Sequence, residues 1–202
     1  MLIYVATSNA GKLRDFRAAA RDFAGVEIEP LPGLSDIPAP PEDESTFEGN
    51  ARAKAIYYSR FAPGSWVVAD DSGLEVDALG GRPGVRSARF ALDVGADVEE
   101  GGTDAANNAE LLKALEGEEN RSAHYRCALA LAADGVVEVV TFGRLDGEIL
   151  TLPAGTDGFG YDPLFYSEEL ESTMAEAPME NRMRVSHRGR ALRALLRRWQ
   201  PC

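Results

Sequence analysis

The sequence is poor in the residues and runs that mark several protein classes. It has two cysteines and two histidines among 202 residues. Cys127 lies in an apolar run and Cys202 is the final residue, so we expect reduced thiols rather than a disulfide framework. Neither cysteine has a second one at the spacing of a zinc site. The longest apolar run, 127–133, is far shorter than the roughly 20 residues of a membrane span, so we expect no membrane association.

Positive charge is also scarce. The 21 basic residues are outnumbered by 33 acidic ones, which leaves a net charge of −12. Binding to a nucleic-acid backbone calls for a clustered basic surface, so this balance disfavours a nucleic-acid partner. The first residues lack the basic region of a secretory signal, and Asn9 and Lys12 interrupt their apolar run. We therefore expect a cytoplasmic protein.

The alternation of apolar and polar segments predicts an α/β fold with a mixed sheet in a single domain spanning 1–202. Strands are expected at 2–6, 26–29, 66–69, 123–132, 136–142 and 144–150. Helices are expected at 13–23, from a capping box at Ser45 and Glu48 to about Phe61, and at 103–115, 168–176 and 186–199. The proline-rich segment 30–45 is expected to form a long irregular loop.

The segment TSNAGK (7–12) follows the first strand and opens a helix, where backbone amides favour an anion. It is not a P-loop, because that motif requires glycine at 6 and Ser or Thr at 13, where this chain has Ala6 and Leu13. Ser8, Asn9 and Lys12 could still donate to a phosphate. A helix cap followed by a solvated lysine is the competing interpretation.

Carboxylates gather at the expected end of the strand 66–69, where Asp70 and Asp71 precede Ser72. In α/β sheets, ligands bind at such strand ends. Adjacent carboxylates on an apolar strand are costly unless they are paired, hydrogen-bonded or bound to a metal. Together with acids of the 30–45 loop they would suit Mg²⁺, and an Asx-turn over 70–73 is the alternative.

Other polar pairs have local explanations of their own. Asn50 and Lys54 share one face of a helix, which could line a cleft or face solvent. Ser186 is a plausible N-cap, after which His187 and Arg188 could donate to a carbonyl oxygen or simply be exposed. The segment TDGFGYDP (156–163) could be a tight turn with core aromatics or a loop that holds a flat ligand against a ring.

In order along the chain, TSNAGK, TFEGNARAK, ADDSGLEVDALGGRPGVRSARFA, GTDGFGYDP and SHRGRAL closely resemble the inosine/xanthosine triphosphate pyrophosphatase family. The resemblance spans about 5–195, and its most specific parts are ADDSGLEVDALGG and GFGYDP. It implies an elongated fold with two lobes and the active-site cleft between them, and a homodimer. It also implies Mg²⁺-dependent hydrolysis of ITP, dITP and XTP to the monophosphate and pyrophosphate, which cleanses the nucleotide pool.

The resemblance assigns roles to individual residues. Glu42 and Asp71 match the metal carboxylates, and Asp71 also matches the general base for water. Arg182 stands where the family often has a lysine. Arginine keeps the positive charge there but not the compact ammonium group of lysine. The predicted substrate-binding residues are Thr7, Ser8, Asn9, Ala10, Gly11, Lys12, Asn50, Lys54, Ser72, Phe159, Gly160, Tyr161, Asp162, Arg182, His187 and Arg188.

Within this set, Phe159 is expected to stack on the purine and Tyr161 to belong to the core, while His187 and Arg188 are expected to read the 6-oxo group. Two other functions remain open at this point. A related pyrophosphatase for modified pyrimidine or canonical nucleotides is disfavoured by the base-reading segments. A regulatory nucleotide-binding module without catalysis is disfavoured by the joint presence of Lys12, Lys54 and Asp71.

Overall fold

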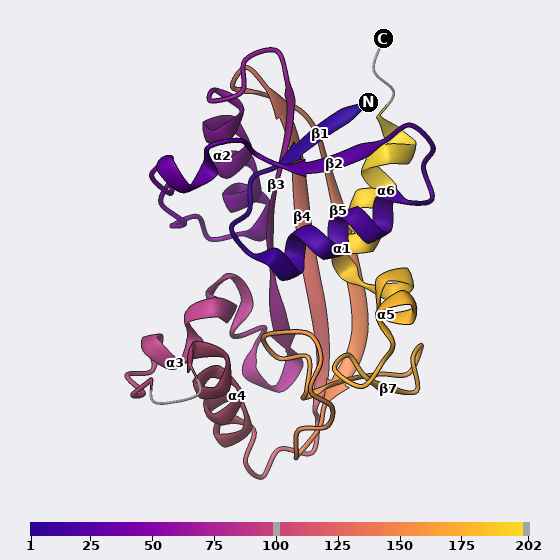
Figure 1. The fold of residues 1–202 in the computed structure, drawn as a ribbon. Coiled ribbons are helices and arrows are strands. Elements are labelled where there is room, and N and C mark those ends of the chain that lie inside the picture. The colour runs from indigo at the N-terminus through magenta and orange to yellow at the C-terminus, as the bar shows by residue number, and fades with distance from the viewer. Residues whose placement is uncertain (99–101, 200–202) are drawn as a thin grey trace. The chain divides into compact units, whose positions relative to one another are not determined.

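Helices alternate with strands in the first part of the chain, and all the strands belong to one mixed sheet (Figure 1). The computed structural model describes residues 1–98 and 102–199. The strands are β1 (Leu2–Val5), β2 (Glu27–Pro30), β3 (Trp66–Val76), β4 (Ser122–Ala133), β5 (Val136–Ile149), β6 (Phe165–Ser167) and β7 (Ser172–Thr173). The helices are α1 (Ala10–Ala20), α2 (Phe47–Ser59), α3 (Phe90–Asp93), α4 (Gly102–Ala114), α5 (Met179–Val185) and α6 (His187–Arg198).

The seven strands lie in the order β2-β1-β3-β4-β5-β6-β7. β1 pairs in parallel with β2 and with β3, whereas β6 pairs antiparallel with β5 and β7. A sheet with both kinds of pairing confirms the predicted α/β class with a mixed sheet.

The chain divides into two compact units. Unit 1 comprises 1–72, 127–144 and 186–202, and unit 2 comprises 73–126 and 145–185. Strands β3, β4 and β5 each contribute residues to both units. Each of the other described strands and helices belongs to one unit alone.

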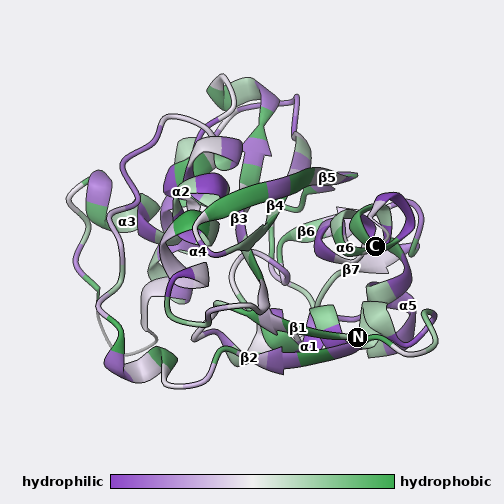
Figure 2. Cartoon of the chain, turned by 90° about the horizontal axis from the view of Figure 1, so that it is seen from above, coloured by the Kyte–Doolittle hydropathy of each residue, from purple (hydrophilic) through white to green (hydrophobic). Residues whose placement is uncertain are grey.

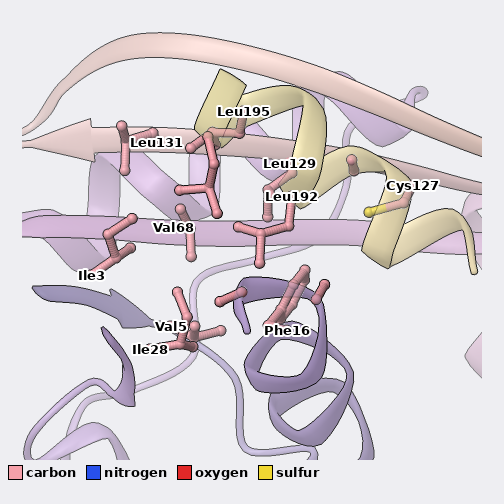
Figure 3. Packing of buried hydrophobic residues seen from close by; sticks show 14 residues of the cluster. Ile3, Val5, Phe16, Ile28, Val68, Cys127, Leu129, Leu131, Leu192 and Leu195 are labelled. Carbon is pink, nitrogen blue, oxygen red and sulfur yellow. The ribbon is translucent and has the colours of Figure 1, made fainter. Parts of the chain in front are cut away.

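In unit 1, successive residues of β3 and β4 point to opposite faces of the sheet, as the pleat requires. On one face, Val68 and Leu129 pack with Phe16 of α1 and Leu192 of α6 (Figure 3). The other face is built from alanines that pack with α2, namely Ala51, Ala55, Ala69, Ala128, Ala130 and Ala132. Small side chains on both partners let α2 lie close to the strands.

The thiol of Cys127 belongs to the first of these faces (Figure 3). It is buried and forms no disulfide, as predicted. Burial raises the pKa of the thiol, so it stays protonated at neutral pH. Cys202 lies outside the described residues.

Unit 2 has a core of its own, to which strands β3, β4, β5 and β6 and helices α3, α4 and α5 all contribute. Leu111 and Leu145 are fully buried there. The rings of Tyr125 and Phe165 stack with centroids 4.3 Å apart.

Several predicted boundaries are wrong. The strand predicted at 66–69 runs on through the predicted loop 70–73 to Val76, and the two strands predicted at 136–142 and 144–150 are one strand, β5. A side chain at Gly147 would overlap the carbonyl oxygen of Tyr166, so this glycine marks the close approach of β6 rather than a turn.

One predicted helix is absent, and the predicted N-cap of another helix is wrong. The segment 168–176 is no helix, because Glu171 adopts a positive φ of 53° and β7 follows directly. Helix α2 is capped by Thr46, whose hydroxyl accepts from the amide of Gly49 at 3.0 Å, and not by Ser45. Glu48 pairs instead with Arg52 one turn later.

Figure 2 shows hydrophilic and hydrophobic residues side by side on helices such as α1, α2 and α6. Within 1–98 and 102–199, none of the helices has both the length and the apolar character that crossing a bilayer demands.

Candidate active site

The pleat of β3 separates two neighbouring carboxylates. Val68 and Asp70 point toward α1 and α6, while Ala69 and Asp71 point toward α2. Asp70 and Asp71 therefore do not form a carboxylate pair. Each of them meets a lysine of its own.

On the α2 face, Asp71 is held at both oxygens. Lys54 Nζ lies 2.9 Å from Oδ1, and Asn50 Nδ2 donates to Oδ2 at 3.0 Å. Lys54 Nζ also lies 3.0 Å from Oε1 of Glu42, which brings the loop carboxylate to the same cation. The two predicted metal carboxylates thus come together at one point in unit 1.

Asn50 ties this cluster to the loop that precedes α2. Its amide oxygen accepts from the backbone N–H of Glu44 at 3.1 Å, while its nitrogen holds Asp71. At 2% exposure, Asn50 is buried and does not face solvent. The alternative of an exposed polar face for Asn50 and Lys54 is therefore wrong.

Burial and charge compete in this cluster. Burial raises the pKa of Asp71 despite the opposing effects of Lys54 and Asn50. Burial lowers the pKa of Lys54, but the carboxylates of Asp71, Asp70 and Glu42 outweigh it and raise the pKa overall. The lysine therefore remains a cation beside a carboxylate that holds its proton more readily than usual.

On the opposite face, Asp70 Oδ2 lies 2.9 Å from Lys12 Nζ and accepts from Ser72 Oγ at 3.0 Å. Arg188 Nη2 donates to Ser72 Oγ at 3.1 Å. Burial raises the pKa of Asp70, but Lys12 and Arg188 more than compensate and hold it well below its usual range. Asp70 is therefore ionised at neutral pH.

The segment 7–12 enters α1 earlier than predicted. The helix begins at Ala10, and its N-cap is Asn9, whose side chain accepts from the amide of Lys12 at 3.0 Å. Thr7 Oγ1 accepts from the amide of Asn9 at 3.2 Å. Ser8 is exposed, but the Lys12 side chain is only 19% exposed. The helix cap of the competing interpretation is therefore confirmed at Asn9, but its solvated lysine is wrong, because Lys12 is largely buried.

The start of α6 is similarly ordered. Ser186 is its N-cap and accepts from the amide of Gly189 at 3.0 Å, as predicted. His187 is only 1% exposed, so it is not the exposed residue of the alternative interpretation. Burial lowers the pKa of His187 far below its usual value, and Arg188 lowers it further. The imidazole is neutral at pH 7 and has one N–H donor.

Gly143 of β5 lets α6 dock at this point. A Cβ at Gly143 would overlap the carbonyl oxygen of His187 and lie 2.7 Å from the backbone nitrogen of Ala191. Thr141, two residues earlier, donates its hydroxyl to the carbonyl of Ala191 at 2.8 Å. The sequence predicts Gly143 to lie between two strands, whereas a glycine inside one strand, as the structure has it, marks a close backbone approach.

In unit 2, the loop 156–162 is organised around Asp162. The carboxylate accepts from the amide of Phe159 at 3.1 Å and from the hydroxyl of Tyr125 at 2.9 Å. Gly158 has a φ of +83°, and a side chain there would overlap Asp162. Tyr161 is 4% exposed and belongs to the core of unit 2, as predicted.

Residues of α4 hold the same loop, which the sequence did not reveal. Asp104 accepts from the amide of Gly160 at 2.7 Å, and Asn108 donates to the carbonyl of Gly160 at 3.0 Å.

Arg182 of α5 is 8% exposed and donates to the carbonyl of Met174 at 2.9 Å. Its guanidinium therefore has a structural contact within unit 2.

The donor set on the α2 face fits a hard cation. Mg²⁺ is held in proteins by one or two carboxylates and completes its shell with water and phosphate oxygens. Glu42 and Asp71 supply two carboxylates that already converge on one positive charge. Within 1–98 and 102–199 there is no cluster of three or more acidic, histidine or cysteine side chains suited to a metal.

Comparison with known proteins gives consistent matches over nearly the whole chain. The model of the Ham1 family matches residues 3–198. A protein of Acidobacterium capsulatum named dITP/XTP pyrophosphatase is 56% identical over 202 residues, 98% of each chain. One of the same name from Geobacter sulfurreducens is 47% identical over 195 residues, 96% of this chain and 94% of the relative.

Solved structures match as well. The Ham1 protein of Staphylococcus aureus superposes with a TM-score of 0.79 at 36% identity, over 96% of both chains. The nucleoside-triphosphatase / dITP/XTP pyrophosphatase of Mycobacterium abscessus has a TM-score of 0.70 at 43% identity, over 97% of this chain and 99% of that one.

Proposed function

This chain belongs to the Ham1 family, and we propose that it hydrolyses dITP, XTP and ITP to their monophosphates and pyrophosphate. It is a nucleoside triphosphate pyrophosphatase, like the relatives that share about half of its sequence. One observation carries the catalytic proposal. A buried lysine, Lys54, lies 2.9 Å from the carboxylate of Asp71 and 3.0 Å from that of Glu42.

Hydrolysis of a phosphoanhydride requires a positioned water and neutralisation of charge on the phosphoryl oxygens. We assign the first task to Asp71, which orients the water and accepts its proton. Asn50 and Lys54 support this role, because they hold both carboxylate oxygens in one orientation.

The triphosphate is assigned to the start of α1 and to the two lysines. The first amides of α1 and the ammonium groups of Lys12 and Lys54 supply positive charge to an anion. Ser8 and Ala10 are exposed next to the N-cap Asn9, which leaves this end of the helix open to solvent.

Glu42 and Asp71 would hold Mg²⁺. When bound, this ion neutralises phosphate charge and makes the phosphorus more susceptible to attack. The resemblance implies the metal, and the two converging carboxylates support it.

Base selection is assigned to His187 and Arg188, whose N–H groups would donate to an oxo group at C6. Adenine has an amino donor there, which would leave both protein donors unpaired. The neutral state of His187 fits this role, since it retains one N–H. Phe159 is proposed as the ring on which the purine stacks, in a loop held by Asp162.

We further propose a cytoplasmic homodimer. The location follows from the substrate class, since nucleotide precursors are used there. The homodimer follows from the family resemblance, and sedimentation of the purified chain would test it. A monomer at micromolar concentration would contradict it.

The decisive experiment is a product assay. The purified chain is incubated with Mg²⁺ and dITP, XTP, ITP, dATP or GTP, and pyrophosphate and orthophosphate are measured separately. We expect pyrophosphate as the product, with dITP, XTP and ITP strongly preferred. Asp71→Asn is the matched inactive control. Orthophosphate alone, or equal rates with dATP and dITP, would contradict the proposal.

A further inference from the structure

Asp70 is a buried carboxylate for which the proposed reaction has no task. It is 4% exposed and projects from β3 toward α1 and α6. Its Oδ2 atom lies 2.9 Å from Lys12 Nζ, 3.0 Å from Ser72 Oγ and 3.9 Å from Arg188 Nε. One oxygen atom therefore gathers side chains from α1, β3 and α6.

Two of these three side chains, Ser72 and Arg188, are also linked to each other, and Arg188 is linked to α1. Arg188 donates to the hydroxyl of Ser72, which donates to Asp70. The direction is fixed, because a guanidinium only donates and a carboxylate only accepts. Arg188 Nη1 also lies 3.4 Å from Oδ2 of Asp15 on α1. Within unit 1, the first turns of α1 and α6 are thus tied together by polar contacts.

Asp70 is badly suited to contact the substrate itself. A carboxylate repels a triphosphate, and Oδ2 of Asp70 already contacts Lys12 and Ser72. Its effect on the reaction must therefore pass through the groups that it holds. Lys12 and Arg188 are substrate contacts in the proposed function, and the family resemblance implies a substrate contact for Ser72 as well.

We propose that Asp70 is a positioning residue that holds Lys12, Ser72 and Arg188 in the single arrangement that receives the nucleotide. The proposal rests on the proposed function, because it takes these three residues as substrate contacts. A purely structural ion pair is the competing explanation. Removal of Asp70 would then lower the thermal midpoint but leave kcat/KM of the folded protein unchanged, whether or not Lys12 is present.

A double-mutant cycle on the full chain separates the two explanations. kcat and KM for dITP with Mg²⁺, and the thermal midpoint, are measured for the wild type, Asp70→Asn, Lys12→Ala and the double variant. We expect Asp70→Asn to lower kcat/KM about 10- to 100-fold, the size of effect that misplaced groups cause. In the Lys12→Ala background the same change should have an effect at least about fivefold smaller. Equal effects in both backgrounds would overturn the proposal.

A second cycle covers the case in which Asp70→Asn does not fold. Ser72→Ala removes the hydroxyl between Arg188 and Asp70 without leaving a buried charge unpaired. It is paired with Lys12→Ala, because Lys12 and Ser72 both contact Oδ2 of Asp70, and the pair should show the same non-additive loss in kcat/KM. Additive losses here would likewise count against the positioning role.

Asp93→Asn is the matched control, because Asp93 is also an aspartate in an ion pair, at 32% side-chain exposure, with Arg86. It should leave kcat/KM within about twofold, as is usual for a surface pair. If the wild type does not hydrolyse dITP, the proposed function fails. The first cycle is then measured on the Kd of inorganic tripolyphosphate by calorimetry. Coupling between Asp70 and Lys12 would support positioning, and additivity would refute it.

Discussion

Gly143→Ala should displace the first turn of α6. The added Cβ would overlap the carbonyl oxygen of His187 and lie 2.7 Å from the nitrogen of Ala191. Carbon–oxygen contacts are normally no shorter than about 3.3 Å, so the helix backbone must move by roughly 1.4 Å. Neither neighbour is the end of a flexible side chain, so the strain cannot be relieved by a rotamer change.

Overpacking of this kind costs about 3 kcal/mol when backbone must shift. With a slope of about 2 kcal/mol/M in urea, the unfolding midpoint should fall by about 1.5 M. The movement also reaches His187 and Arg188, so the preference for dITP over dATP should narrow.

Tryptophan fluorescence in a urea titration is a direct assay, because the two tryptophans of the chain lie in unit 1. Trp66 of β3 and Trp199, the residue after α6, form an edge-to-face pair with ring centroids 4.7 Å apart. Thr141→Ser is the control, since it adds no atom and keeps the hydroxyl that bonds to α6. A Gly143→Ala protein with the wild-type midpoint and emission would refute the close approach of α6 to β5.

Two further changes test individual residues. Burial keeps the pKa of His187 in the folded chain below 6.5, its usual value in an unfolded chain. Below about pH 6.5 the unfolded chain therefore binds a proton that the folded chain does not. The stability of the folded state is complete above about pH 6.5 and falls as the pH is lowered toward the folded pKa. His187→Gln should therefore flatten the decline of the unfolding free energy, obtained from urea titrations, between about pH 6.5 and 5. The slope should fall by up to about 1.4 kcal/mol per pH unit, and an unchanged slope would speak against the buried neutral state. Phe159→Ala should weaken nucleotide binding by about 1–3 kcal/mol, measured as KM for dITP, if the ring stacks on the base. Leu152→Ala, at a side chain 74% exposed in the same unit, is its control, and equal KM values for the two variants would exclude stacking.

The sequence predicts the α/β class because its apolar runs alternate with amphipathic ones, and these patterns reflect burial directly. The prediction of secondary structure from the sequence is wrong where a polar segment is buried. The run Asp70-Asp71-Ser72-Gly73 has the composition of a turn, yet it lies in the middle of β3. What makes this possible is the pairing of each carboxylate with a lysine from another element, and those partners are 58 and 17 residues away in sequence.

The residues of the candidate site likewise divide into those that the sequence predicts and those that it does not. Lys54, Asp71 and Glu42 could be named from their motifs, and the structure brings them together. The residues that hold the motifs in place could not be named in the same way. Asp104 and Asn108 reach the 156–162 loop from α4, and nothing in their local sequence distinguishes them from solvent-facing helix residues.

The opposite orientations of Asp70 and Asp71 make β3 unusually sensitive to insertions and deletions. Side chains alternate along a strand, so a shift of one residue exchanges the faces on which all of them lie. One residue added between Trp66 and Asp70 would turn Asp71 toward α1 and α6. It would also place Asp70 opposite Lys54 and leave Lys12 facing Ala69. A pair of added residues would restore the faces and displace both carboxylates along the strand by about 7 Å. Library designs on this scaffold should therefore vary the loops and keep the length of β3 constant.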